Sequence, residues 1–251
     1  MPQNFTINIA GENALIIYFC EQGTSQVNAN VSAKVSAKVQ QAENIIRKAM
    51  KQELAQDIID LVPSYASLMV MFNMMTTDHH HIRQELRILL QQIDSHSKEY
   101  AVTQAPHTIE LPVYYSHESG PDLSIIAQRA KLTVEQVITL HQAQAYSVYA
   151  IGFAPGFAYL GEVDERIAAP RLSTPRIKVP KGAVAIADRQ TAVYPSESPG
   201  GWNIIGLCPI NMFDAKSNPI MPVTVGDKVK FKAISKDQFI ALGGTLETSY
   251  E

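Results

Sequence analysis

Residues 150–214 read AIGFAPGFAYLGEVDERIAAPRLSTPRIKVPKGAVAIADRQTAVYPSESPGGWNIIGLCPINMFD. Glycine, proline and aromatic side chains are denser here than any helix requires. Glycine opens backbone angles that are closed to other residues, and proline fixes its own. The stretch therefore predicts short strands joined by stiff, tight turns. Such turns can display a binding surface or can merely connect strands, and for the stretch as a whole we favour a binding surface.

Short apolar segments run through this stretch and beyond it. They read KVPKGAVAIA (178–187), TAVYP (191–195), WNIIGL (202–207) and DKVKFKAI (227–234). Many short strands separated by glycine and proline indicate a closed barrel or a sandwich. We also expect residues 221–234 to form a final strand pair that turns at Val225-Gly226-Asp227.

Two short helices precede the strand-rich stretch, at 121–144. Pro121 suits a first helical turn, and Thr133 with Gln136 forms a capping box in which each side chain satisfies the other's free amide. His141 shares a helical face with Val137 and therefore points inward. Two interpretations of His141 stay open, a hydrogen-bonded core histidine and a residue of the functional site.

The first third of the chain alternates strand and helix patterns. Strands are predicted at 5–9, 14–19, 57–63, 66–72 and 107–115, and helices with apolar spacings of three and four at 27–50 and 78–94. The second helix has Thr77 or Asp78 as its N-cap. This order favours a small α+β domain at 1–100, an open sheet with two helices on one face, followed by a mostly β barrel domain at 101–251.

Composition limits the possible functions and compartments. The net charge of −3 comes from mixed acidic and basic residues, so no basic face for nucleic acid is expected. The N-terminus lacks a signal-peptide pattern, and no window approaches the roughly 20 apolar residues that span a bilayer, so we expect a cytoplasmic protein. Cys20 and Cys208 do not suggest a disulfide framework. The low share of charged residues favours a protein partner.

Several common active-site patterns are absent from the sequence. There is no G-x-S-x-G, G-x-G-x-x-G, H-E-x-x-H or C-x-x-C motif. Gly156 and Gly161 have P-loop spacing, but Glu162 stands where a phosphate-binding lysine belongs. His79, His80 and His81 diverge by about 100° each on a helix and cannot converge on one ion, so we expect no metal site.

Cationic side chains on stiff turns remain as candidates. Arg171 and Arg176 each follow a proline, and the planar guanidinium suits carboxylate or phosphate oxygens. Gln190, Thr191 and Tyr194 add neutral hydrogen-bonding groups suited to an amide. The alternative is that both arginines pair on the surface with acidic residues, for which the candidates are Asp164, Glu165 and Asp188.

A series of motifs in order resembles a known family. The motifs are Gly120-Pro121-Asp122-Leu123, Leu140-His141, residues 146–149, residues 151–161, Asp164-Glu165-Arg166, Pro170-Arg171, Pro175-Arg176, Val179-Pro180, Gln190-Thr191, Tyr194-Pro195 and residues 198–202. Over about residues 105–232 they resemble the family of 5-oxoprolinase B subunits (PxpB), which is also called the KipI family or the first-subunit family of allophanate hydrolase.

The resemblance implies a cyclophilin-like barrel and a multisubunit enzyme. Its expected partners are the 5-oxoprolinase C subunit, of related barrel fold, and the A subunit. Together such proteins are expected to open 5-oxoproline (pyroglutamate), a cyclic amide, to glutamate at the expense of ATP, and this chain alone to be inactive. ATP, with any Mg²⁺ that accompanies it, is expected to be shared with or held by one of the partners.

We assign candidate roles on this basis. Arg171, Arg176 and His141 are the candidate catalytic residues. The candidate substrate-binding residues are the amide-orienting Gln190, Thr191 and Tyr194, the amides of Gly200 and Gly201, and the loop and wall residues Phe153, Pro155, Gly156, Phe157 and Trp202.

The sequence also departs from the family pattern, which leaves other functions open. Ala168, Ala169 and Leu172 stand where a histidine, a threonine and an arginine are common, and Asp188 replaces a glycine. These changes fit a divergent substrate or a chain that only binds. The alternatives are therefore a KipI-like inhibitor that docks onto a sensor histidine kinase and the carboxyltransferase component of a urea carboxylase.

Overall fold

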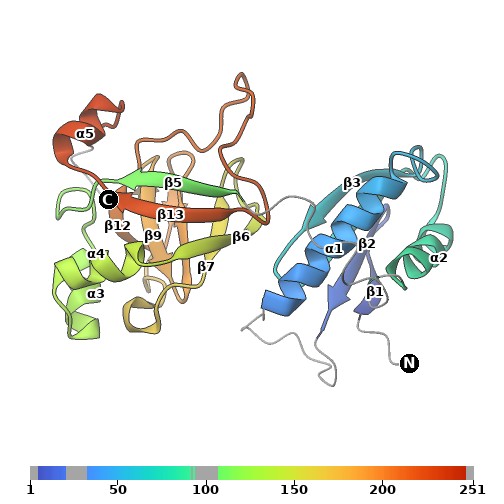
Figure 1. Cartoon of the computed structure of the whole chain (residues 1–251), viewed down its shortest axis with the longest axis horizontal. Coiled ribbons are helices and arrows are strands. Elements are labelled where there is room, and N and C mark those ends of the chain that lie inside the picture. Colours follow the sequence, from blue (N-terminus) through green and yellow to red (C-terminus); the bar gives the residue numbers. More distant parts are fainter. Residues whose placement is uncertain (1–4, 21–32, 92, 94–106, 247–251) are drawn as a thin grey trace. The chain divides into compact units, whose positions relative to one another are not determined.

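The computed structural model describes residues 5–20, 33–91, 93 and 107–246 (Figure 1). The chain divides into two compact units, Met1–Ala105 and Pro106–Glu251. The boundary predicted at residue 100 lies outside the described residues, as do residues 27–32 of the first predicted helix.

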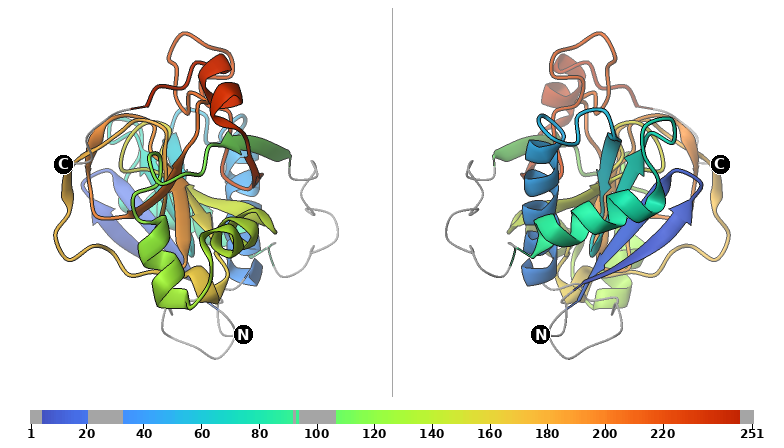
Figure 2. Two further views of the ribbon diagram at one scale, coloured as in Figure 1. Left: turned by 90° about the vertical axis from the view of Figure 1, so that its left-hand side faces the viewer. Right: turned by 90° about the vertical axis from the view of Figure 1, so that its right-hand side faces the viewer.

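The first unit is a four-stranded antiparallel sheet with two helices. Its elements are β1 (Phe5–Gly11), β2 (Ala14–Phe19), α1 (Ala33–Ala49), β3 (Ile58–Pro63), β4 (Ser67–Phe72) and α2 (His79–Leu90). The strand order is β1-β2-β4-β3. Both helices pack against the same core as the sheet, and Figure 2 shows them on one side of the strands. The sheet is open and carries two helices on one face, but the strand predicted at 107–115 is not part of it, because β5 (Thr108–Val113) belongs to the sheet of the second unit.

Local sequence explains these elements. In β2, Leu15, Ile17 and Phe19 alternate with less buried residues and so line one face of the sheet. The N-cap of α2 is Asp78, whose carboxylate accepts a hydrogen bond from the amide of His81 at 2.8 Å.

The second unit contains the predicted barrel and the predicted helical pair. Its elements are β5 (Thr108–Val113), α3 (Leu123–Ala130), α4 (Val134–Gln142), β6 (Ala145–Ile151), β7 (Ala158–Gly161), the 3-10 turn η1 (Glu165–Ile167), β8 (Arg176–Val179), β9 (Ala183–Ala187), β10 (Gln190–Val193), β11 (Ser198–Gly200), β12 (Asn203–Leu207), β13 (Lys228–Ala233) and α5 (Lys236–Ala241). The capping box of Thr133 and Gln136 is present at the start of α4.

Seven strands of this unit form a nearly closed sheet. Their order is β12-β9-β10-β7-β6-β13-β5. A backbone bridge between Tyr114 and Leu207 joins the two outer strands, with N–H···O distances of 2.8 and 3.0 Å. Strands β8 and β11 form a separate two-stranded ribbon. The fold class is therefore confirmed: an α+β N-terminal domain followed by a mostly β, barrel-like domain.

Two features of the C-terminal part differ from prediction. Residues 221–227 form no strand, and β13 instead pairs in parallel with β5 and antiparallel with β6. The helix α5 was not predicted, although Ser235 and Gln238 form a second capping box. In the described residues no helix is long and apolar enough to cross a membrane.

Candidate functional site

Strands β9 and β10 present two different faces, and the candidate site lies on one of them. Backbone pairing sets Gln190 opposite Ala187 and Ala192 opposite Ala185, and Tyr194 donates its amide to the carbonyl of Ala183. Side chains alternate along strands, so these residues share one face. We call it the alanine face, after Ala183, Ala185, Ala187 and Ala192. Small side chains there leave room for large rings.

Aromatic rings fill the space above the alanines. The ring of Phe157 meets three neighbours edge to face, with centroids 5.2 Å from Tyr194, 5.6 Å from Trp202 and 4.8 Å from Tyr159. Phe153 adds a fourth edge contact to Phe157 at 5.3 Å. Such contacts stabilise a fixed arrangement of rings beyond the area they bury. The predicted wall residues Phe153, Phe157 and Trp202 are thus brought together.

Arg171 lies on a segment that is anchored on both sides. Before it, Ala169 and Asp188 exchange backbone hydrogen bonds; after it, the amide of Leu172 donates to the carbonyl of Gly201 at 2.7 Å. The guanidinium carbon of Arg171 lies 5.8 Å from the centre of the Trp202 ring, which is a cation–π contact. The side chain is exposed and forms no ion pair with any residue that the structure describes.

Arg176, the first residue of β8, is held in a different way. Its Nη2 atom lies 2.8 Å from Oδ1 of Asp122; the side chains are 16% and 2% exposed, respectively. The other carboxylate oxygen of Asp122 accepts a hydrogen bond from the amide of Ile204 at 2.7 Å. The buried Nη1 atom of Arg176 has no hydrogen-bond partner among the residues that the structure describes. Buried donors without a partner are rare, so this atom requires an explanation.

Among the described residues, neither arginine forms the surface pairs with Asp164, Glu165 or Asp188 that were the alternative to anion binding. Asp164 instead binds Arg166 through two hydrogen bonds of 2.9 and 2.8 Å. Glu165 pairs with Arg189. Asp164 and Arg166 are two residues apart in the chain, whereas Glu165 and Arg189 meet only in the fold.

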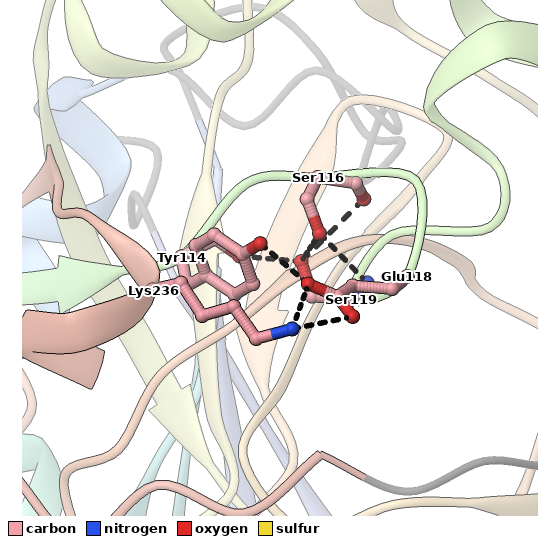
Figure 3. A network of polar contacts seen from close by, with 5 residues as sticks. All are labelled: Tyr114, Ser116, Glu118, Ser119 and Lys236. Atoms are coloured by element: carbon pink, nitrogen blue, oxygen red, sulfur yellow. Dashed lines mark hydrogen bonds and ion pairs between the residues drawn. The ribbon is translucent and has the colours of Figure 1, made fainter. Parts of the chain in front are cut away.

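The loop before Asp122 is fixed by a polar network (Figure 3). Glu118 accepts hydrogen bonds from the hydroxyl of Tyr114 at 2.6 Å and from Lys236. The hydroxyl of Ser119 donates to the carbonyl of Tyr114 at 2.7 Å and lies 3.0 Å from that of Ser116. These contacts close the loop on itself, so Asp122 begins α3 from a rigid turn.

Tyr194 lies within electrostatic range of both arginines. Burial raises the pKa of its phenol to about 12, and the positive charges of Arg171 and Arg176 oppose that rise. A Cβ atom at Gly200 would overlap the Tyr194 hydroxyl, so glycine allows the ring to lie against β11. Gly200 in turn pairs with Arg176. The hydroxyl therefore lies beside β11 and the start of β8.

The loop at 152–157 forms one border of the cluster. Phe153 adopts a φ of +72°, rare for a side chain of this size, and is 67% exposed. Gly156 has a φ of +86° and packs against the carbonyl of Met212. Pro155 lies exposed between them.

His141 and Thr191 lie away from this face, which argues against their predicted roles. Thr191 points to the opposite face of β10, where its hydroxyl lies 2.9 Å from Nε2 of His141. The imidazole is fully buried, its Nδ1 lies 2.7 Å from the Tyr115 hydroxyl, and burial lowers its pKa to about 3. A histidine so enclosed is a core residue, and neither side chain belongs to the candidate site.

The remaining predicted residues are placed as follows. Gln190 shares the alanine face and lies opposite Gly161 on β7. Gly201 contributes its carbonyl to the segment that holds Arg171. Cys208 packs in the core on the other side of the sheet. The described residues hold no cluster of three metal-ligating side chains.

Sequence patterns did not predict three residues of the site. Asp122 lies 54 residues before Arg176, and no spacing signal links them. Tyr159 was not named from the sequence, although it stands two residues after Phe157 and strand alternation would place both on one face. The third is Ser198 on β11, whose buried hydroxyl, like Nη1 of Arg176, has no partner within the described ranges.

Comparison with known proteins now adds to the geometry. Residues 6–223 match the family model of the carboxyltransferase domain, subdomain C and D. The chain is 34% identical to the B subunit of 5-oxoprolinase from Bacillus subtilis (strain 168) over 252 residues, which is 96% of this chain and 98% of that protein.

Solved structures share the fold. TTHA0988 is 29% identical, with a TM-score of 0.71, and the match covers 88% of this chain. The urea carboxylase of Kluyveromyces lactis is 13% identical, with a TM-score of 0.69 over 94% of this chain, a likeness in fold alone. This chain spans 40% of TTHA0988 and 22% of the urea carboxylase, so both are much longer proteins.

Proposed function

This chain belongs to the family of 5-oxoprolinase B subunits, and we propose that it is the B component of an enzyme that hydrolyses 5-oxoproline to glutamate with ATP. The observation that supports this most is the contact of Arg171 with the Trp202 ring. Both Arg171 and Arg176 also act electrostatically on Tyr194, which lies in the same aromatic cluster. A small cyclic amide that carries one carboxylate matches such a set of cationic, hydroxyl and flat apolar groups.

The chemistry explains why such groups are needed. A lactam is a poor electrophile, so its carbonyl must be activated before water attacks and the C–N bond breaks. ATP would supply a phosphoryl group for that activation. Arginines that neutralise developing negative charge on oxygen accelerate such a step.

The residues of this chain take the following roles in the proposal. Arg171 binds the substrate carboxylate, and the indole of Trp202 beneath it limits the orientations of the guanidinium. Tyr194 and Gln190, on the same face, orient the amide. The amides of Gly200 and Gly201 are further donors at the edge of the site.

Nucleotide binding is proposed to involve a partner. The orphaned Nη1 of Arg176 fits one oxygen of a carboxylate, carbonyl or phosphoryl group. The sequence offers no P-loop for a triphosphate. We therefore propose that ATP is shared with, or held by, the C or the A component of the enzyme, and that this chain is inactive alone.

The experiment that tests this function is reconstitution. The chain is purified with the C and A components of the same organism, and release of ADP and glutamate from 5-oxoproline, ATP and Mg²⁺ is measured. We expect turnover with all three proteins and none when this chain is omitted. Arg171→Ala should lower kcat/KM at least about 100-fold, whereas Arg166→Ala, which removes an exposed arginine paired with Asp164, should not.

Two other outcomes would redirect the assignment. Absence of turnover with the genuine partners, together with capture of a sensor histidine kinase, would indicate an inhibitor. Turnover that depends on bicarbonate and biotin would indicate a carboxyltransferase component. The 13% identity to urea carboxylase does not favour the latter.

A further inference from the structure

We propose that Asp122 is a positioning residue that makes Arg176 a charge-balanced donor to a neutral carbonyl oxygen, leaving Arg171 as the single net cation of the site. This inference rests on the proposed function and assigns a different role to each of the two arginines of the site. It predicts a ligand class: small molecules with one anionic group and one neutral amide carbonyl.

The first step concerns charge. Arg176 and Asp122 form a 2.8 Å ion pair between side chains that are 16% and 2% exposed. A buried pair of this kind sums to no net charge. Arg171 is exposed, lies on the Trp202 ring and has no ion-pair partner among the described residues. One positive charge is therefore left for an anion.

The second step concerns geometry. One carboxylate oxygen of Asp122 binds Nη2 of Arg176, and the other accepts from the amide of Ile204 at 2.7 Å. The amide of Asp122 itself donates to the carbonyl of Ile204 at 3.0 Å. Asp122 is thus held at three points, two through its carboxylate and one through its backbone amide, and its carboxylate holds the Nη2 side of the guanidinium.

The third step concerns the unused donor. With Nη2 occupied by Asp122, the buried Nη1 of Arg176 finds no partner in the described part of the chain, and neither does the buried hydroxyl of Ser198. Both residues lie in the β8–β11 ribbon, where Gly200 pairs with Arg176. The buried Nη1 of Arg176 is explained if a ligand oxygen completes it. A donor whose charge is already balanced suits a carbonyl that gains charge only during the reaction.

A binding experiment on the full-length chain tests the charge balance without turnover. Inorganic phosphate is the probe, and its affinity is measured by titration with calorimetry. Asp122→Asn keeps the shape of the side chain but removes the negative charge that balances Arg176. The site therefore gains a second net positive charge. We expect phosphate to bind about tenfold more tightly than to the wild type. Arg171→Gln should abolish the binding. Equal or weaker binding by Asp122→Asn would overturn the charge assignment.

A kinetic experiment on the reconstituted complex tests the roles. The double variant Asp122→Asn/Arg176→Gln replaces the ion pair with a neutral pair of similar shape, so it guards against misfolding of the single variant. We expect its kcat to fall about 100-fold, with the KM for 5-oxoproline changed by less than about threefold. Arg171→Gln should instead raise KM at least about tenfold. A double variant that keeps its kcat would overturn the proposal.

The two tests separate the inference from the proposed function. A wild-type complex without turnover defeats the function, while the phosphate experiment still decides the charge balance. A wild-type complex with turnover whose variants show neither effect defeats only the inference.

Discussion

The Nε2 atom of His141 lies 2.9 Å from the hydroxyl oxygen of Thr191, although 50 residues separate the two. The Thr191 hydroxyl donates to the carbonyl of Ala185 at 3.0 Å, so it accepts from His141. Nδ1 must then be the acceptor of the Tyr115 hydroxyl at 2.7 Å. This chain of bonds fixes a neutral imidazole with its proton on Nε2.

The first prediction is a pH dependence of stability that originates at His141. Its pKa is lowered by burial from 6.5 to about 3 in the folded chain. Between these values the unfolded state binds a proton that the folded state does not. The free energy of unfolding therefore contains a contribution from the neutral, buried His141. That contribution is complete above pH 6.5 and is lost as the pH falls toward 3, by up to about 1.4 kcal/mol per pH unit.

The measurement is urea unfolding between about pH 7 and 5, a window on the acid side of the ordinary histidine pKa. Trp202 is the only tryptophan, so its fluorescence reports on the second unit. The His141→Gln variant is the control and should show a flatter pH profile. A wild-type free energy of unfolding that stays constant across this window would contradict the assignment.

The second prediction concerns Thr191, which the sequence suggested as a substrate ligand. Thr191→Val removes the acceptor of His141 Nε2 while keeping the shape, and an unsatisfied buried donor costs about 1–3 kcal/mol. We expect a loss of stability of that size and an unchanged KM for 5-oxoproline. Thr139→Val, at an exposed threonine whose hydroxyl bonds the carbonyl of Glu135, should change stability less. A raised KM for 5-oxoproline with unchanged stability would instead indicate that Thr191 contacts the substrate.

The contrast between Thr191 and Gln190 shows how far sequence could predict the site. Both were chosen for their chemistry, yet strand alternation in residues 190–194 already separates Thr191 from Gln190 and Tyr194. The ion pair of Arg176 with Asp122 had no such signal, because it arises only when the turn before α3 meets β12. The sequence could therefore predict which neighbouring side chains share a strand face, but not which residues far apart in the chain meet in the fold.

The same distinction applies to the fold. The capping box at Thr133 predicted α4, and the equivalent box at Ser235 carries the same local signal for α5. The parallel pairing of β13 with β5 joins segments more than a hundred residues apart, and no local pattern specifies it. Residues 221–227 resemble a strand in composition but form none, because β6 and β5 already flank β13 on both sides.

The third prediction concerns the packing of α5 on the core cluster that includes the alanine face. Phe239 is 2% exposed and belongs to the same core as Phe157 and Trp202. Phe239→Ala should lower the free energy of unfolding by about 3–5 kcal/mol and shift the emission of Trp202. Ile240→Ala, at the next position and 49% exposed, is the matched control and should have little effect. Equal effects of the two variants would show that α5 does not anchor this face.

The last prediction concerns the contact between Gly200 and Tyr194. A Cβ at Gly200 would overlap the Tyr194 hydroxyl and approach its Cζ to 3.1 Å, and the ring is only 2% exposed, so it has little room to move. Gly200→Ala should therefore destabilise the second unit by about 1–3 kcal/mol and lower the turnover of the reconstituted complex.

A matched glycine and a double variant make this test specific. At Gly201 the nearest atom to a new Cβ is 3.7 Å away, so Gly201→Ala should fold with near wild-type stability. Tyr194→Phe removes the overlapping hydroxyl, so in combination with Gly200→Ala it should recover at least about 1 kcal/mol relative to the sum of the single variants. Strict additivity of the two substitutions would mean that the hydroxyl does not lie against β11, and with it the placement of Tyr194 beside Arg176 would fail.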